Sequence, residues 1–173
     1  MPHCEKSQIK LQNCVFRLDL KIDANRLQQY AVLNKSLNCF KLKLKNVTLQ
    51  IFLTSSCAMC FLKSYNLPKL DEYGLVIKNF RLVTTVYTYK LLSKIVNMNT
   101  FYSICRKVTK SVNFEPELFP CLTLKCFGVT VRIFHSGSVI ILGAKQEQQL
   151  VKAIRYLNDL YFEYSVHCNF ENI

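Results

Sequence analysis

The sequence predicts an α+β fold in which two similar repeats share an antiparallel sheet, with helices on one face and the other face open. One observation is an alternating apolar pattern with a short turn at 129–142, and a second is a weaker copy of this region upstream. The third is an amphipathic helix after Lys145 that could cover one sheet face. The predicted halves are residues 1–74 and 75–173, which together form one domain.

Residues 129–142 have the pattern of a β-hairpin with a Ser-Gly-Ser turn. The odd positions of the first strand are apolar, whereas the even positions are Thr130, Arg132 and Phe134. A large aromatic beside a cation on an open sheet face indicates a binding surface.

Residues 37–52 resemble residues 119–134 without a gap, at a constant offset of 82 positions. The matching pairs are Cys39/Cys121, Leu42/Leu124, Lys43/Lys125, Val47/Val129, Thr48/Thr130, Ile51/Ile133 and Phe52/Phe134. Shared turn positions favour duplication over chance.

The other elements fit the same plan. Alternation predicts strands at 9–20, 47–54, 58–63 and 75–90. Helices are predicted from about Asn99 or Thr100 to Lys107, and after Lys145, with a short counterpart at 68–75. Asp23 is a candidate N-cap for a further helix. The buried stripe of that helix is expected to hold Leu27, Tyr30 and Ala31, with Leu33 as a further candidate.

The composition favours a polyanionic partner. Lys and Arg number 23 against 11 Asp and Glu, which gives a formal charge of +12, and nucleic acid is favoured over an anionic membrane surface. Because half of the residues are hydrophobic, wholesale disorder is excluded. Nine scattered cysteines do not form a disulfide pattern, and no signal sequence or membrane span is predicted. We expect an intracellular protein with reduced thiols.

No catalytic, metal or cofactor site is predicted. Cys57-x-x-Cys60 is a lone pair without the further ligands that zinc needs, and strand alternation places its two cysteines on opposite faces. His3, His135 and His167 show no nucleophile–base arrangement. The expected protein is therefore not an enzyme.

Three segments resemble the second repeat of the TATA-box-binding protein (TBP) family: Phe-Glu-Pro-Glu-Leu-Phe-Pro at 114–120, Ile133-Phe134-x-Ser136-Gly137, and Gly143-Ala144-Lys145. The first repeat is similar but eroded, with Leu11-Gln12-Asn13 in its first strand and Ile51-Phe52 at the wedge position. The resemblance implies a saddle of two pseudo-symmetric repeats, with helices on the convex face. Its concave face would bind the minor groove of A·T-rich double-stranded DNA. The implied protein is a transcription initiation factor of the nucleus, or of a viral transcription site if it is virus-encoded.

The resemblance also assigns roles to residues. Phe119 and Phe134 would wedge base steps at one end of the site, and Leu37 and Phe52 at the other. The DNA-binding candidates are Asn13, Leu37, Phe52, Lys63, Asn79, Phe119, Arg132, Phe134 and Lys145. The candidates for protein partners, including a TFIIB-type factor, are Glu115, Glu117, Lys152 and Arg155.

Four residues depart from the family pattern. In the family a threonine precedes Gly-Ala-Lys. Its position is expected to be occupied by Leu142 in the second repeat and by Cys60 in the first. The leucine two residues before the wedge phenylalanine is Arg132 in one repeat and Gln50 in the other. Arginine is favourable in a narrow minor groove, so these departures predict DNA binding with an altered sequence preference.

Two function classes stay open. One is a divergent TBP-like factor that binds and bends promoter DNA as a monomer. The other is an interaction module with weak or lost DNA binding that sequesters or recruits general transcription factors. A third, an accessory domain of a glycosylase or nuclease, is disfavoured because no catalytic motif is present.

Overall fold

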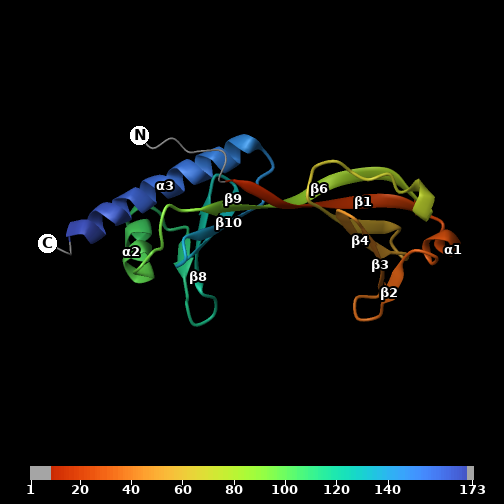
Figure 1. The fold of residues 1–173 in the computed structure, drawn as a ribbon, viewed down its shortest axis with the longest axis horizontal. Helices are drawn as coiled ribbons and strands as arrows, with labels where there is room; N and C mark the ends of the chain where they lie inside the picture. The colour runs from red at the N-terminus through yellow and green to blue at the C-terminus, as the bar shows by residue number, and fades with distance from the viewer. Residues whose placement is uncertain (1–8, 171–173) are drawn as a thin grey trace. The chain divides into compact units, whose positions relative to one another are not determined.

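The computed structural model describes residues 9–170, which form two compact units (Figure 1). The first unit is Leu11–Thr85, and the second contains the residues from Val86 onward together with the described residues up to Lys10. Strand β6 (Leu75–Lys90) begins where the second predicted half begins and continues from the first unit into the second.

The first unit is an antiparallel sheet in the strand order β2-β3-β4-β5-β1, followed by the first part of β6. Its elements are β1 (Lys10–Ile22), α1 (Ala24–Leu27), β2 (Val32–Asn34), β3 (Cys39–Leu44), β4 (Val47–Phe52), β5 (Cys57–Leu62) and the 3₁₀ helix η2 (Asp71–Tyr73).

The second unit repeats this plan in the order β6-β10-β9-β8-β7. Its further elements are α2 (Met98–Val108), β7 (Val112–Phe114), β8 (Cys121–Cys126), β9 (Val129–Phe134), β10 (Ser138–Leu142) and α3 (Glu147–Phe170). The strands and helices predicted for this half are all present, and only the short strand β7 was not predicted.

The strand register confirms the internal repeat. Lys41 pairs with Gln50 in β3 and β4, and Thr123 pairs with Arg132 in β8 and β9, at the predicted offset of 82. On the next strand the offset is 81, because Cys60 pairs with Leu49 whereas Ile141 pairs with Val131. The cause is the turn between these strands, which has one residue more in the first unit (53–56) than in the second (135–137).

The core of the second unit lies between one face of its sheet and the helices α2 and α3. The odd positions of β9 are buried there, and the apolar stripe of the predicted amphipathic helix is buried in the same core. That stripe consists of Leu150, Ile154, Leu157 and Tyr161. Phe101 of α2 packs edge-on against Tyr164 of α3, with ring centroids 5.5 Å apart. The opposite face of the sheet lies outside this core.

The core of the first unit is covered by shorter segments. Asp23 caps α1 by accepting a hydrogen bond from the Arg26 amide at 3.2 Å, as predicted, and Leu27 is fully buried. The prediction of a longer helix was wrong: Tyr30 and Leu33 are 50% and 49% exposed. The chain leaves the helix after Leu27 because residues 32–34 form β2, whose backbone pairs with β3.

The counterpart of α3 in the first unit is the three-residue helix η2. It lies within the predicted range 68–75 and ends at Gly74, where the backbone is left-handed with a φ of 76°. A Cβ at this position would lie 2.9 Å from Arg26 Cβ and 3.0 Å from the Asp23 carbonyl oxygen, which is closer than van der Waals contact, so both the φ angle and the space require glycine there. Among the described residues, no helix is both long and apolar enough to cross a membrane.

Candidate nucleic-acid interface

The sheet face opposite the core of the second unit carries three cross-strand rows of side chains, which are partly or fully exposed except for the buried Cys121. The central row runs through Thr123, Arg132, Ile140 and Thr88. The row on one side contains Cys121 and Phe134, and the row on the other contains Lys125, Thr130, Leu142 and Val86. These strand pairs confirm the alternation predicted for residues 119–134, and they place apolar and cationic groups on one face.

Phe119, Phe134 and Arg132 form an aromatic–cation cluster on this face. The two rings are 6.3 Å apart between centroids at an angle of 67°, and the guanidinium carbon of Arg132 lies 5.4 Å from the Phe119 centroid. Phe119 is still 47% exposed. A large apolar group held beside a cation on an uncovered face has the chemistry of a nucleic-acid contact.

A tight turn holds Phe119 in place. The Phe119 amide donates a hydrogen bond to the Glu115 carbonyl at 2.9 Å, and the Cys121 amide donates to the Phe119 carbonyl at 2.8 Å. The Glu115 carboxylate accepts a hydrogen bond from the Asn113 side chain at 2.9 Å. The segment Phe-Glu-Pro-Glu-Leu-Phe-Pro therefore presents the ring at the end of the β8–β9 hairpin.

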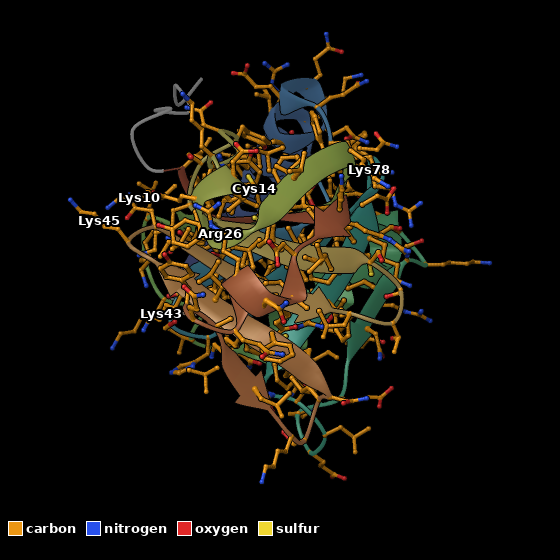
Figure 2. All side chains as sticks on the ribbon, turned by 90° about the vertical axis from the view of Figure 1, so that its right-hand side faces the viewer. Lys10, Cys14, Arg26, Lys43, Lys45 and Lys78 are labelled. Carbon is orange, nitrogen blue, oxygen red and sulfur yellow. The ribbon has the colours of Figure 1, made fainter. Side chains whose placement is uncertain are left out.

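The equivalent face of the first unit carries Phe52, which pairs directly with Cys57. Leu37 lies in the turn between β2 and β3, where its amide donates to the Asn34 side chain at 3.3 Å and its side chain is 51% exposed. Both predicted wedge positions are therefore available on this unit. Figure 2 shows Lys43 and Lys45 extending outward from the β3–β4 hairpin.

The other predicted DNA-binding residues are exposed but are not gathered into one cluster. Asn13 lies on β1 with the parity of the open face, and Lys63 directly follows β5. Asn79 is exposed on β6, where its side-chain oxygen accepts a hydrogen bond from the Phe80 amide at 2.8 Å. Lys145 follows β10, and its amide donates to the Gln149 side chain at 2.9 Å.

One position expected on the open face was assigned to the wrong residue. Cys60 is fully buried in the core, so it cannot occupy the place of Leu142. That place belongs to Phe61, because Phe61 pairs with Thr48 as Leu142 pairs with Thr130. The extra turn residue in the first unit shifts the match by one position and therefore to the other face of the strand.

The strand register also adds residues that the sequence alone did not single out. On the central row of the first unit, Gln50 is flanked by Lys41 and Met59, and Met59 pairs in turn with Arg17. Strand alternation in β1 and β5, combined with the pairing of these two strands, would have placed Arg17 and Met59 on the open face.

The two open faces differ in charge next to the wedge position. In the first unit Cys57 pairs with Asp19, whose carboxylate lies 3.8 Å from the Arg17 guanidinium. In the second unit the equivalent position is Lys90, which pairs with Ser138. The Lys90 ammonium donates hydrogen bonds to the Ser136 carbonyl at 2.7 Å and to the Ser138 hydroxyl at 3.1 Å.

The predicted protein-contact residues are all exposed. Glu115 and Glu117 flank the turn that precedes Phe119, and Leu118 in the same turn is 80% exposed. Lys152 and Arg155 line a shallow depression on α3 together with Glu147, Gln148 and Val151.

The cysteines have the properties of packing residues. Burial raises the pKa of the Cys60 and Cys105 thiols to about 12 and that of Cys126 to about 11. Cys57 and Cys60 lie on opposite faces of β5, as predicted. Within residues 9–170, no group of three or more His, Cys, Asp or Glu side chains could hold a metal ion. His3 lies outside the described residues.

Comparisons with known proteins identify the class of this fold. Residues 79–163 match the family model described as "Transcription factor TFIID (or TATA-binding protein, TBP)". The structure is similar to that of Methanococcus jannaschii TBP, with a TM-score of 0.67 and 23% identity over 90% of this chain and 99% of that chain. No curated protein sequence matches the chain.

The protein therefore has the two-repeat α+β fold of the TATA-binding proteins, as predicted. Within this fold, residues 79–163 are also similar in sequence to the TBP family. That family consists of transcription factors and not of enzymes, in agreement with the prediction from the sequence.

Proposed function

We propose that this protein is a transcription initiation factor that binds A·T-rich duplex DNA in the minor groove through its two open sheet faces and bends it. The observation that carries the proposal is the exposed Phe119–Phe134 pair beside Arg132 on an uncovered face. Minor-groove proteins insert apolar wedges between base steps, and the unstacking cost of about a few kcal/mol per step is offset by the wrapped interface.

The charged residues have a separate role in this proposal. Lys43, Lys63, Lys125 and Lys145 are exposed at the strand ends of the two units, where they would contact phosphates. Asn13 would contact base edges, which in the minor groove mainly distinguish A·T from G·C pairs. Asn79 fits this role less well, because on β6 it has the opposite parity to Val86 and Thr88 of the open face. Phosphate contacts release counterions, so the affinity should fall steeply as the salt concentration rises.

In this proposal the protein acts as a monomer on promoter DNA, in the nucleus or at a viral transcription site. It would work with a TFIIB-type factor and other general transcription factors. The support is the match to the family of transcription factors and the exposed turn at Glu115 and Glu117.

Fluorescence anisotropy with an A·T-rich duplex tests the proposal. Phe119→Ala/Phe134→Ala should weaken binding by about 100-fold, because each lost base-stacking contact is worth about 1–3 kcal/mol. Phe162→Ala is the matched control, since Phe162 is 64% exposed on α3 and lies away from the sheet face. If the wild-type protein binds no better than the double variant, the groove-binding proposal is wrong.

A second candidate function is a protein-interaction module that sequesters or recruits general transcription factors. It is favoured by Leu118, which is 80% exposed between Glu117 and Phe119. Pull-down of a TFIIB-type factor should be lost with Glu117→Arg and kept with Asp159→Arg, which makes the same charge change on α3. Binding that is indifferent to Glu117→Arg would contradict a role for this turn.

A further inference from the structure

The two units place chemically different side chains at one equivalent position of their open faces. Gln50 lies in the middle of β4 opposite Lys41, and Arg132 lies in the middle of β9 opposite Thr123. Both are half-buried, and the next strand gives each an apolar neighbour, Met59 or Ile140. A ligand on either face therefore meets this side chain at the centre of the sheet.

The hydrogen-bonding capacities of the two side chains are not the same. Arg132 can only donate, and its guanidinium is held over the Phe119 ring at 5.4 Å. Gln50 can donate through its amide nitrogen and accept through its amide oxygen. Only the first unit therefore offers a neutral acceptor at this position.

This difference matches the chemistry of the minor groove. An A·T pair presents only acceptors there, whereas a G·C pair adds the donor amino group on guanine N2. We infer that the two units read different half-sites: the half under Arg132 must be A·T, and the half under Gln50 also accepts G·C. This inference rests on the proposed function, and it gives the protein a preferred orientation on DNA.

Charge next to the wedge positions supports the same asymmetry. Asp19 on the first unit takes the place that Lys90 holds on the second. The acceptor-only carboxylate thus lies on the same unit as Gln50, and the donor-only ammonium lies on the same unit as Arg132. Both differences make the first unit better suited to a groove that contains a donor.

A palindromic A·T duplex provides the test. A single G·C pair, scanned through one half-site, leaves one good orientation of the two, whereas G·C pairs at both symmetric positions leave none. We expect the best single substitution to lower the affinity by about twofold, and the corresponding double substitution to lower it by about tenfold more. Equal and independent losses for the two substitutions would overturn the inference.

Protein variants and a modified base test whether Arg132, Gln50 and the guanine amino group cause this difference between the half-sites. Arg132→Gln should restore binding of the doubly substituted duplex, whereas the matched control Arg132→Lys, which keeps a donor-only cation, should not. Gln50→Arg should make even a single G·C pair costly. Replacing guanine by inosine, which lacks the N2 amino group, should also restore binding; if inosine changes nothing, the inference is wrong.

The proposed function fails in a different way from this inference. If the unsubstituted A·T duplex binds no better than an all-G·C duplex, and Phe119→Ala/Phe134→Ala leaves the affinity unchanged, groove binding itself is absent. If the A·T duplex binds well but the two half-sites tolerate G·C equally, groove binding stands and the orientation inference falls.

Discussion

The two units share their strand register but differ in what covers the sheet and in what the open face presents. In the second unit the 24-residue helix α3 covers the core, whereas in the first its counterpart is the three-residue helix η2. The pairs Lys41–Gln50 and Thr123–Arg132 nevertheless occupy the same place in the ladder. Backbone pairing has thus been kept through divergence that changed the helices and the exposed side chains.

The open faces show a graded difference between the units. The second unit has two phenylalanines in contact with each other, one of which lies under the Arg132 guanidinium. The first has Leu37 and Phe52, with Asp19 on the neighbouring strand. If both faces contact DNA, the second unit should contribute more of the affinity, because phenylalanine offers more stacking area than leucine and because Lys90 takes the place of Asp19 on the neighbouring strand.

The largest expected effect is a loss of stability when a buried leucine of α3, or one next to η2, is shortened to alanine. Leu157 of α3 and Leu70 before η2 are 0% and 1% exposed. Leu157→Ala and Leu70→Ala should each lower the free energy of unfolding by about 2–5 kcal/mol. The loss should be larger for Leu157, because the long helix encloses its side chain more rigidly. Urea unfolding followed by circular dichroism measures both, and a larger loss for Leu70 would reverse this comparison.

The second prediction compares the wedge pairs. Leu37→Ala/Phe52→Ala should weaken binding to an A·T-rich duplex by about tenfold, less than the about 100-fold expected for Phe119→Ala/Phe134→Ala. Leu37→Phe should strengthen binding by restoring stacking area. Anisotropy at one fixed salt concentration gives the three values, and equal losses for the two pairs would show that the units contribute alike.

The sequence predicted regular strands better than it predicted short segments. Alternation located β6 at Leu75–Lys90 and the hairpin around Ser136-Gly137-Ser138, because one face of each strand is buried and the other is not. It missed β2 and β7, each of three residues, which are strands only because a neighbouring strand pairs with them. The helical spacing of Tyr30 and Leu33 in the sequence could not show that residues 32–34 pair with β3.

The candidate site was predictable where the repeat has no insertion. Alternation on β9 places Arg132 and Phe134 on one face, and extending the alternation of β8 back by two residues adds Phe119 to the cluster. Cys60 was confused with Phe61 because one extra residue in a turn moves every later residue to the other face. The residues of that turn can be counted only when the ends of its two flanking strands are known, and the strand pairing is what shows those ends.

The third prediction concerns the helix caps. Asp23 accepts from the Arg26 amide at 3.2 Å and Asn97 accepts from the Thr100 amide at 3.1 Å. Asp23→Ala and Asn97→Ala should each cost about 1 kcal/mol in the free energy of unfolding. The exposed neighbours Asn25 and Asn99 supply the controls, because the N-caps of these two helices are Asp23 and Asn97. If the control variants lose as much stability, helix propensity and not capping determines where these two helices begin.

The smallest expected effect is a loss of stability in alkali. Burial raises the pKa of the Cys60 thiol in the first unit and of the Cys105 thiol in the second from 9.0 to about 12. The folded state therefore holds these protons more strongly than the unfolded state does. Their contribution to stability is fully present below the unfolded pKa of 9.0 and is lost as pH rises from there toward the folded value.

The melting temperature should accordingly fall between pH 9 and about pH 12, over the interval between the unfolded and folded pKa values of these thiols. Burial also raises the pKa values of Cys126, Tyr156 and Tyr164 in the second unit and of Cys14 in the first, so the second unit should lose more stability. Cys105→Ala should flatten the pH dependence while leaving the Cys60 part in place, and Cys60→Ala should do the converse. Scanning calorimetry at several pH values measures both slopes, and a slope unchanged in either variant would show that its thiol does not ionise on unfolding.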